Sequence, residues 1–205
     1  MPFDYSKSGL PANPKWHNAA GFCKAWLDQN MTMFGPERIE SFMLHQPVAA
    51  AKLIMDNCPD YSEESITLAL LGPAKGLFLE NERGVAVMGQ IFGARTVELL
   101  KYMAGTGSAA AAGDLPRDAT RLFLVEGLST MNDQLIGRAR IDKHHQVRWN
   151  ILEGLEKKFA AAKGQNPALD KIFAEALTKS RAALQALDDA AKNPSAKKGP
   201  NPPKM

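Results

Sequence analysis

Helix-start and helix-stop signals recur along almost the whole chain, and they constrain the fold more than any other feature. Two segments begin with an asparagine cap and a proline at the first helical position, Asn13-Pro14 and Asn166-Pro167. Apolar residues then recur at helical spacing, in residues 16–27 and 169–187. No alternating run is long enough to compete as a strand. The sequence therefore predicts an all-α protein with a multi-helix bundle as its core.

Proline and glycine mark the predicted boundaries of the inner helices. Ser62 caps a helix that should stop at Gly72-Pro73, because proline has no N–H to donate and disfavours helical backbone at the residue before it. Pro47 can start another helix, and residues 82–105 fit two short helices meeting near Gly93. Longer helices are expected from Pro116 to about Gly137, from an Asp142 cap to Gly164, and from Pro167 onward.

The net positive charge of the chain comes from its last residues. Residues 191–205 contain several prolines, no acidic residue and four lysines, namely Lys192, Lys197, Lys198 and Lys204. Such a composition predicts a disordered basic tail after a single helical domain formed by residues 1–190. Without these lysines the net charge of +3 becomes −1, from 21 basic and 22 acidic residues. A nearly neutral body offers no electrostatic basis for binding DNA, so we expect no DNA partner.

Hydropathy and cysteine content indicate where the protein works. Residues 1–11 lack the basic patch and apolar stretch of a secretory signal, and no run approaches the ~18 apolar residues that span a bilayer. Only Cys23 and Cys58 are present, without the spacing of a zinc site or a redox pair. We therefore expect a cytoplasmic protein with free thiols and no membrane partner. The sequence leaves the oligomeric state open.

Two motifs that could carry chemistry are better explained structurally. Gly105 and Gly107 follow no strand and precede no Gly-Lys-Ser/Thr, so they indicate a loop rather than a phosphate-binding site. His144 and His145 stand beside Asp142, but adjacent helical positions point about 100° apart, which disfavours a shared metal ion. Neither motif supports a cofactor, and we expect none.

Four segments share their order and spacing with a known family. They are FMLHQPVAAAKLI around His45, ITLALLGPAKG around Gly72, MGQIFGARTVELLKYMAG, and ATRLFLVEGLSTMNDQL around Glu126. Together they resemble the HD-domain metal-dependent phosphohydrolases, most closely the branch that hydrolyses guanosine tetraphosphate. In that family a first His opens a helix, an apolar helix ends in Ala-Leu-Leu-His-Asp, and a later helix carries Leu-Ala-Asp-Arg-Leu-His-Asn-Met. The resemblance covers about half of the chain and implies an HD-like helical bundle.

The same resemblance implies that the catalytic residues are largely missing. The family binds a divalent metal through one His, a His-Asp doublet and a distant Asp. The first His corresponds to His45, the doublet falls on Gly72 and Pro73, and the distant Asp falls on Glu126. A catalytic metal needs about three protein ligands, and His45 with Glu126 supplies two at most. His45, Gly72, Pro73 and Glu126 are therefore the vestiges of the family's metal site that the resemblance implies. We expect no bound metal.

Further positions of the family pattern are also replaced. The Glu-Asp pair of the guanosine tetraphosphate branch becomes Gly76 and Leu77. The Arg and the His-Asn of the later helix become Gly127, Ser129 and Thr130. Apolar positions of the family pattern, such as Leu70 and Leu128, are retained in this chain. The further positions, which carry reactive side chains in the family, are occupied here by residues without those groups.

These departures predict a catalytically degenerate HD-fold protein that serves as a binding or regulatory module. Lys75 places a cation beside the lost doublet, so His45, Lys75 and Glu126 are the candidates for binding a small anionic or nucleotide ligand. Two alternatives stay open. The chain is a metal-dependent phosphohydrolase with ligands outside the pattern, or it is a helical interaction module unrelated to the family.

Overall fold

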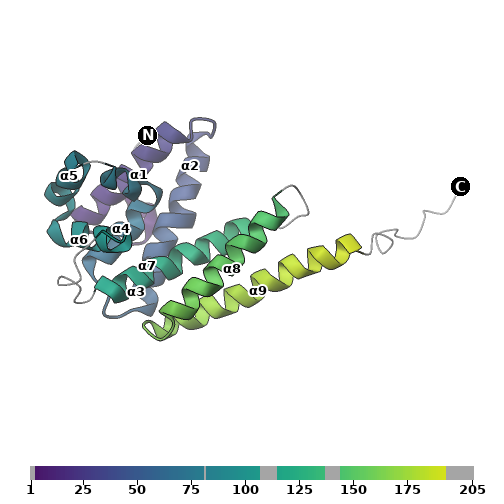
Figure 1. The fold of residues 1–205 in the computed structure, drawn as a ribbon. Coiled ribbons are helices and arrows are strands. Elements are labelled where there is room, and N and C mark those ends of the chain that lie inside the picture. The colour runs from purple at the N-terminus through teal and green to yellow at the C-terminus, as the bar shows by residue number, and fades with distance from the viewer. Residues whose placement is uncertain (1–2, 81, 107–114, 137–143, 193–205) are drawn as a thin grey trace, which may run out of the picture. The chain divides into compact units, whose positions relative to one another are not determined.

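The computed structural model describes residues 3–80, 82–106, 115–136 and 144–192, and every regular element in these ranges is a helix (Figure 1). The predicted all-α class is thereby confirmed. The chain groups into two compact units, one comprising Met1–Glu126 with Gly164–Leu169 and the other Gly127–Lys163 with Asp170–Met205. The predicted Asp142 cap, Gly107 and residues 193–205 of the predicted tail lie outside the described residues.

The first unit is built from short helices that follow one another closely. They are η1 (Tyr5–Ser8), α1 (Pro14–Asn30), α2 (Pro36–Met43), η2 (Leu44–Val48), α3 (Ala49–Asn57), α4 (Glu63–Leu71), η3 (Gly72–Leu79), α5 (Glu82–Phe92), α6 (Ala94–Met103) and most of α7 (Leu115–Thr130). The elements η1 and η3 are 3-10 helices, and η2 is a turn of π-helix.

Local side-chain caps explain why several helices begin where the sequence predicted. The Asn13 side chain accepts hydrogen bonds from the backbone N–H groups of Lys15 and Trp16 at the start of α1. Ser62 caps α4 in the same way by accepting from the N–H of Ser65. Gly93 separates α5 from α6 with a φ of 90°, as its position between two apolar segments predicted.

The prediction that Pro47 starts a helix is wrong. The helical backbone continues from α2 through η2 into α3, so Pro47 lies inside a helical stretch and His45 lies in the same π turn. Proline has no N–H for the regular α-helical bond, and its ring would collide with the carbonyl one turn earlier. The wider π turn accommodates both effects without ending the helix.

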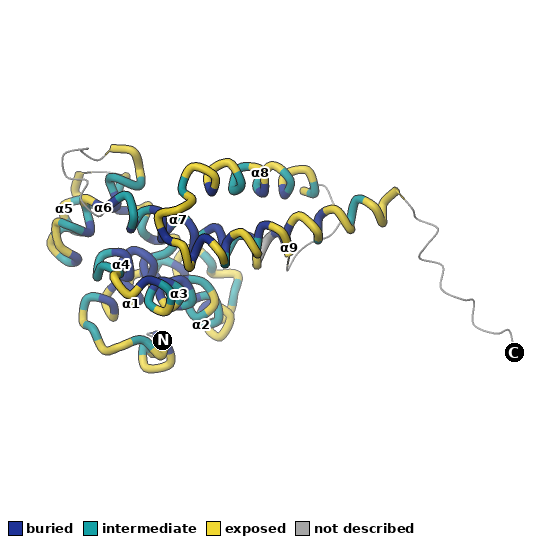
Figure 2. The backbone as a smooth tube through the Cα atoms, turned by 90° about the horizontal axis from the view of Figure 1, so that it is seen from below, coloured by how far each residue is buried: buried dark blue, intermediate teal, exposed yellow. Residues whose placement is uncertain are grey.

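The helix α4 forms the centre of the first unit. Every residue from Ser65 to Leu71 is buried, and α4 packs against α1, α3 and α6 (Figure 2). A helix that is apolar on all sides is stable only when other helices surround it. A further apolar cluster joins Phe22, Phe78 and Phe92, whose ring centroids lie 5.7 to 6.2 Å apart.

A buried arginine joins three segments of the first unit. The Arg121 side chain is 3% exposed and donates to Asp118, to Asp60 and to Asn166. The contact with Asp60 reaches both its backbone carbonyl, at 3.2 Å, and its carboxylate, at 2.5 Å. Arg121 therefore links α7 to the segment before α4 and to residues 164–169.

The second unit consists of the end of α7, then η5 (Met131–Ile136), α8 (His145–Ala162) and most of α9 (Pro167–Lys192). Buried positions recur along one side of α9 in Figure 2. The rings of Phe159 and Phe173 lie 4.9 Å apart between α8 and α9. His145 Nε2 lies 2.5 Å from Asp188 Oδ1, so this histidine joins α8 to α9.

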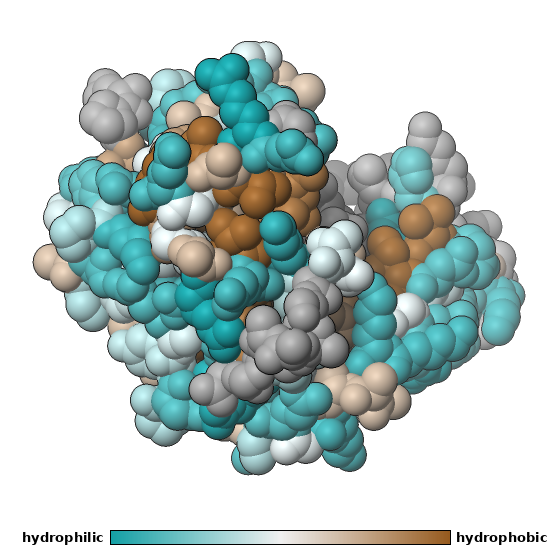
Figure 3. Space-filling model, turned by 60° about the vertical axis from the view of Figure 1, so that its left-hand side comes forward, coloured by the Kyte–Doolittle hydropathy of each residue, from teal (hydrophilic) through white to brown (hydrophobic). Residues whose placement is uncertain are grey.

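The described helices include none that is both long and apolar enough to cross a membrane. Apolar side chains nevertheless reach the surface in places, as the brown areas of Figure 3 show. In the first unit, the exposed large apolar residues include Phe22, Met33 and Leu77.

Candidate functional site

The candidate positions lie on three elements of the first unit. His45 belongs to η2, Gly72, Pro73 and Lys75 belong to η3, and Glu126 belongs to α7. The α-helix α4 ends at Leu71, as predicted, but the chain continues directly into the 3-10 helix η3.

The backbone at Gly72 excludes an ordinary side chain. Its φ of 44° and ψ of −125° lie in a region that residues with a Cβ rarely adopt. A Cβ at this position would lie 3.1 Å from Pro47 Cγ and 3.7 Å from Cys23 Sγ. The position that the resemblance matches to a metal-binding histidine is therefore closed by the proline ring of η2 and by the thiol of α1.

The structure brings Lys75 and Glu126 together. The Lys75 Nζ forms an ion pair with Glu126 Oε1 across a sequence separation of 51 residues. The side chain of Lys75 is 19% exposed and that of Glu126 is 43% exposed. The Glu126 carboxylate is therefore already paired with an ammonium group of the same chain.

Burial dominates the electrostatics beside this ion pair. It lowers the pKa of Lys75 to about 8, because a poorly hydrated ammonium group is unfavourable. It also raises the pKa of the Cys23 thiol to about 12, although a hydrogen bond with the Ala74 backbone opposes the shift. Cys23 is consequently a neutral thiol near physiological pH, a form that is a poor nucleophile.

His45 and Pro73 do not join the ion pair among the contacts of the described residues. His45 is exposed in η2, and Pro73 is exposed at the start of η3. Within the described residues, no group of three or more His, Cys, Asp or Glu side chains is placed to hold a metal ion.

The donor set of this site does not fit a divalent cation. Gly72 has no space for a ligating side chain, and the side chain of Pro73 has no ligating atom. Glu126 faces a positively charged group that would repel a second cation. Hydrolysis through a metal-activated water is therefore not assigned to these residues.

One of the later positions that the resemblance singled out lies in the second unit. Gly127, which the resemblance matches to an arginine, is buried, and a Cβ there would lie 2.6 Å from Phe173 Cε2. Any residue with a Cβ at position 127 would force the Phe173 ring or the α7 backbone to move. Sequence reasoning identified these replacements but missed what fills the space, because the contacts join residues far apart in the chain.

Comparison with known proteins identifies no relative. No family model, no curated protein and no solved structure matches the chain.

Proposed function

We propose that this protein is a catalytically degenerate HD-like module that binds or regulates without hydrolysing a phosphate ester. The proposal rests on the resemblance of four segments to the HD-domain family. The observation that carries it is the combination of a closed Gly72 position with the Lys75–Glu126 ion pair. In this proposal the ammonium group of Lys75 takes the charge-neutralising role that a metal ion has in the family.

Turnover measurements test the loss of hydrolysis. We expect no manganese-dependent hydrolysis of guanosine tetraphosphate by the wild-type protein, and no change on His45→Ala. Manganese-dependent turnover that disappears in His45→Ala would overturn the proposal and favour the phosphohydrolase alternative. The folded state of each variant is checked by its thermal unfolding.

The proposed ligand of the module is a small anion or nucleotide, and Lys75 is its candidate partner. Such a ligand would compete with Glu126 for the ammonium group, because Lys75 is largely buried and already paired. Glu126→Gln should therefore strengthen binding of guanosine tetraphosphate, measured as a rise in melting temperature, whereas Lys75→Met should abolish it. Glu37→Gln, an exposed acid in α2, is the matched control. Equal responses in all variants would exclude Lys75 as the binding group.

A further inference from the structure

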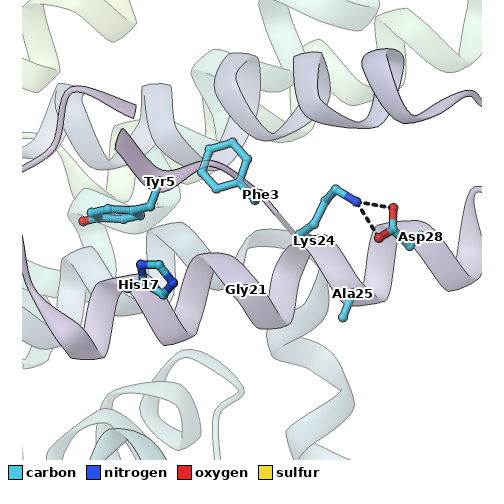
Figure 4. Close-up of a pocket in the computed structure, with 7 residues that line it drawn as sticks. All are labelled: Phe3, Tyr5, His17, Gly21, Lys24, Ala25 and Asp28. Carbon is cyan, nitrogen blue, oxygen red and sulfur yellow. Dashed lines mark hydrogen bonds and ion pairs between the residues drawn. The ribbon is translucent and has the colours of Figure 1, made fainter. Parts of the chain in front are cut away.

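A second candidate site lies along α1, and its lining shares no residue with the candidate positions discussed above. The inference drawn from it does not depend on the function proposed above. A cavity of about 390 Å³ is lined by Phe3, Tyr5, His17, Gly21, Lys24, Ala25 and Asp28 (Figure 4). We refer to these residues as the α1 cavity. Its volume falls within the range of small-molecule pockets, roughly 300–1,000 Å³. All of its residues belong to the first unit.

One end of the α1 cavity is aromatic. The rings of Tyr5 and His17 lie 5.3 Å apart, and the Tyr5 hydroxyl donates a hydrogen bond to the Pro11 carbonyl. Burial raises the pKa of Tyr5, so the phenol stays protonated and neutral at physiological pH. In Figure 4, Phe3 lies between this ring pair and the opposite end, above the part of α1 that carries Gly21. Gly21 has no side chain, so the helix surface beneath Phe3 stays open.

The other end of the α1 cavity is charged. The Lys24 Nζ contacts both carboxylate oxygens of Asp28, one turn further along α1. Lys24 is the buried partner, with 7% of its side chain exposed, whereas 42% of the Asp28 side chain is exposed. A carboxylate offers about four acceptor sites, so Asp28 can accept further hydrogen bonds while it holds Lys24. The group more accessible to a ligand at this end is therefore a carboxylate acceptor, whose charge is partly balanced by Lys24.

We propose that the α1 cavity binds a small monocationic amine with an apolar, ring-bearing body. The ammonium group donates to the exposed oxygens of Asp28, and the body lies along Phe3 and Gly21. The ring packs against Tyr5 and His17 at the far end. His17 and Asp28 are separated by roughly 16 Å along the helix axis, a distance suited to an amine separated from its ring by a chain of several atoms.

The distribution of charge selects this ligand class over two others. An anion would have to reach the Lys24 ammonium group, which is more deeply buried than that of Lys75, with 7% against 19% of the side chain exposed, and which contacts both oxygens of Asp28. A polyamine would need a second carboxylate at the far end, where the cavity presents Tyr5 and His17. A single positive charge at one end and an apolar ring at the other match the lining.

The test compares two probes of similar shape and opposite charge, 4-phenylbutylamine and 5-phenylpentanoate, by isothermal titration calorimetry with the full chain. We expect binding of the amine and none of the carboxylate. Lys24→Met should strengthen amine binding, because it frees Asp28 and removes a positive charge. Asp28→Asn should weaken amine binding about tenfold, the value of one hydrogen bond to a charged group. Asp56→Asn, an exposed acid in α3, should leave the affinity unchanged.

A variant that fills the α1 cavity with a larger side chain tests the proposed amine binding even if the charge variants unfold. The Cβ of a residue at position 21 meets no heavy atom within 4 Å, and the same holds at Gly154 in α8. Gly21→Leu should therefore fold and fill the α1 cavity, which abolishes amine binding, whereas Gly154→Leu should fold and bind normally. Binding of the carboxylate in preference to the amine would overturn the proposal. So would unchanged amine binding in Gly21→Leu, or no amine binding by the wild-type protein.

Discussion

At Gly72, the backbone conformation and the surrounding side chains both require a residue without a Cβ. Its φ of 44° disfavours any residue with a Cβ, and Pro47 Cγ lies 3.1 Å from the place a Cβ would occupy. Gly72→Ala should lower the free energy of unfolding by about 1–3 kcal/mol, as measured by urea denaturation. Gly76→Ala is the control, since no heavy atom lies within 4 Å of its Cβ, and its effect should stay within about 0.5 kcal/mol. Equal effects of the two substitutions would contradict the assigned strain.

Lys75 gives the stability of the protein a specific pH dependence. Burial lowers its pKa in the folded state to about 8 from an ordinary value of 10.5. Between these values the unfolded chain binds a proton that the folded chain lacks, so unfolding becomes less favourable as pH rises. The stability of the wild type relative to Lys75→Met should therefore increase from pH 8 to pH 10, by at most about 1.4 kcal/mol per pH unit. Cys23 is present in both proteins, but its thiol and the Lys75 ammonium group influence each other's pKa, so the difference also contains this coupling.

Thermal unfolding of both proteins at a series of pH values measures this difference. A difference that remains constant between pH 8 and pH 10 would show that Glu126 keeps Lys75 charged in the folded state.

Arg121 should be the most sensitive charged residue of the first unit. Its guanidinium is buried between Asp118, Asp60 and Asn166. Arg121→Ala leaves a buried carboxylate without its partner and should cost about 3–5 kcal/mol. Arg117, which pairs with the same Asp60 but is 40% exposed, provides the comparison. Its replacement by alanine should cost about 1 kcal/mol or less, and chemical denaturation that ranks the two variants in the opposite order would refute this assignment.

At the scale of elements, the π turn of η2 and the end of α4 depend on one another. The Pro47 ring in η2 occupies the space beside Gly72 that a side chain would need. The loss caused by Gly72→Ala should therefore be smaller when Pro47 is also replaced by alanine. A double-mutant cycle should give a coupling of at least about 0.5 kcal/mol, as residues in contact do. Additive effects would show that backbone strain alone accounts for the glycine.

The sequence predicts helices better than it predicts the contacts between them. Asn13 and Ser62 act within three residues of themselves, so their caps could be recognised from local sequence. The prediction at Pro47 was wrong because the local sequence does not distinguish a proline inside a helix from a proline at the start of one. The π turn that admits it depends on the two flanking helices, whose continuity local sequence does not fix.

The contacts of the candidate site around Lys75 were even harder to predict from the sequence than the helix boundaries. The resemblance identified Gly72, Lys75 and Glu126 as positions of interest, and their chemistry follows from residue type alone. That Lys75 pairs with Glu126 could not be predicted, because 51 residues separate them and each has many possible partners. The α1 cavity was missed entirely, since its walls come from η1 and one face of α1, and His17 had no partner in the local sequence.

At the scale of the whole molecule, the all-α class follows from helical periodicity, while the division into two compact units does not. The chain crosses between the units inside α7, between α8 and α9 at Lys163 and Gly164, and again inside α9. No composition change or long linker marks these crossings, so the sequence predicted one domain from residue 1 to residue 190. At two of the three crossings a continuous helix carries the chain from one unit to the other.

Metal content tests most directly the central proposal, that the site formed by Gly72, Lys75 and Glu126 does not hold a divalent ion. Purified protein is dialysed against excess manganese and then against metal-free buffer, and the bound metal is measured by elemental analysis. We predict far less than one manganese ion per chain for the wild type, and the same for His45→Ala. About one tightly bound ion per wild-type chain, lost in His45→Ala, would contradict the claim.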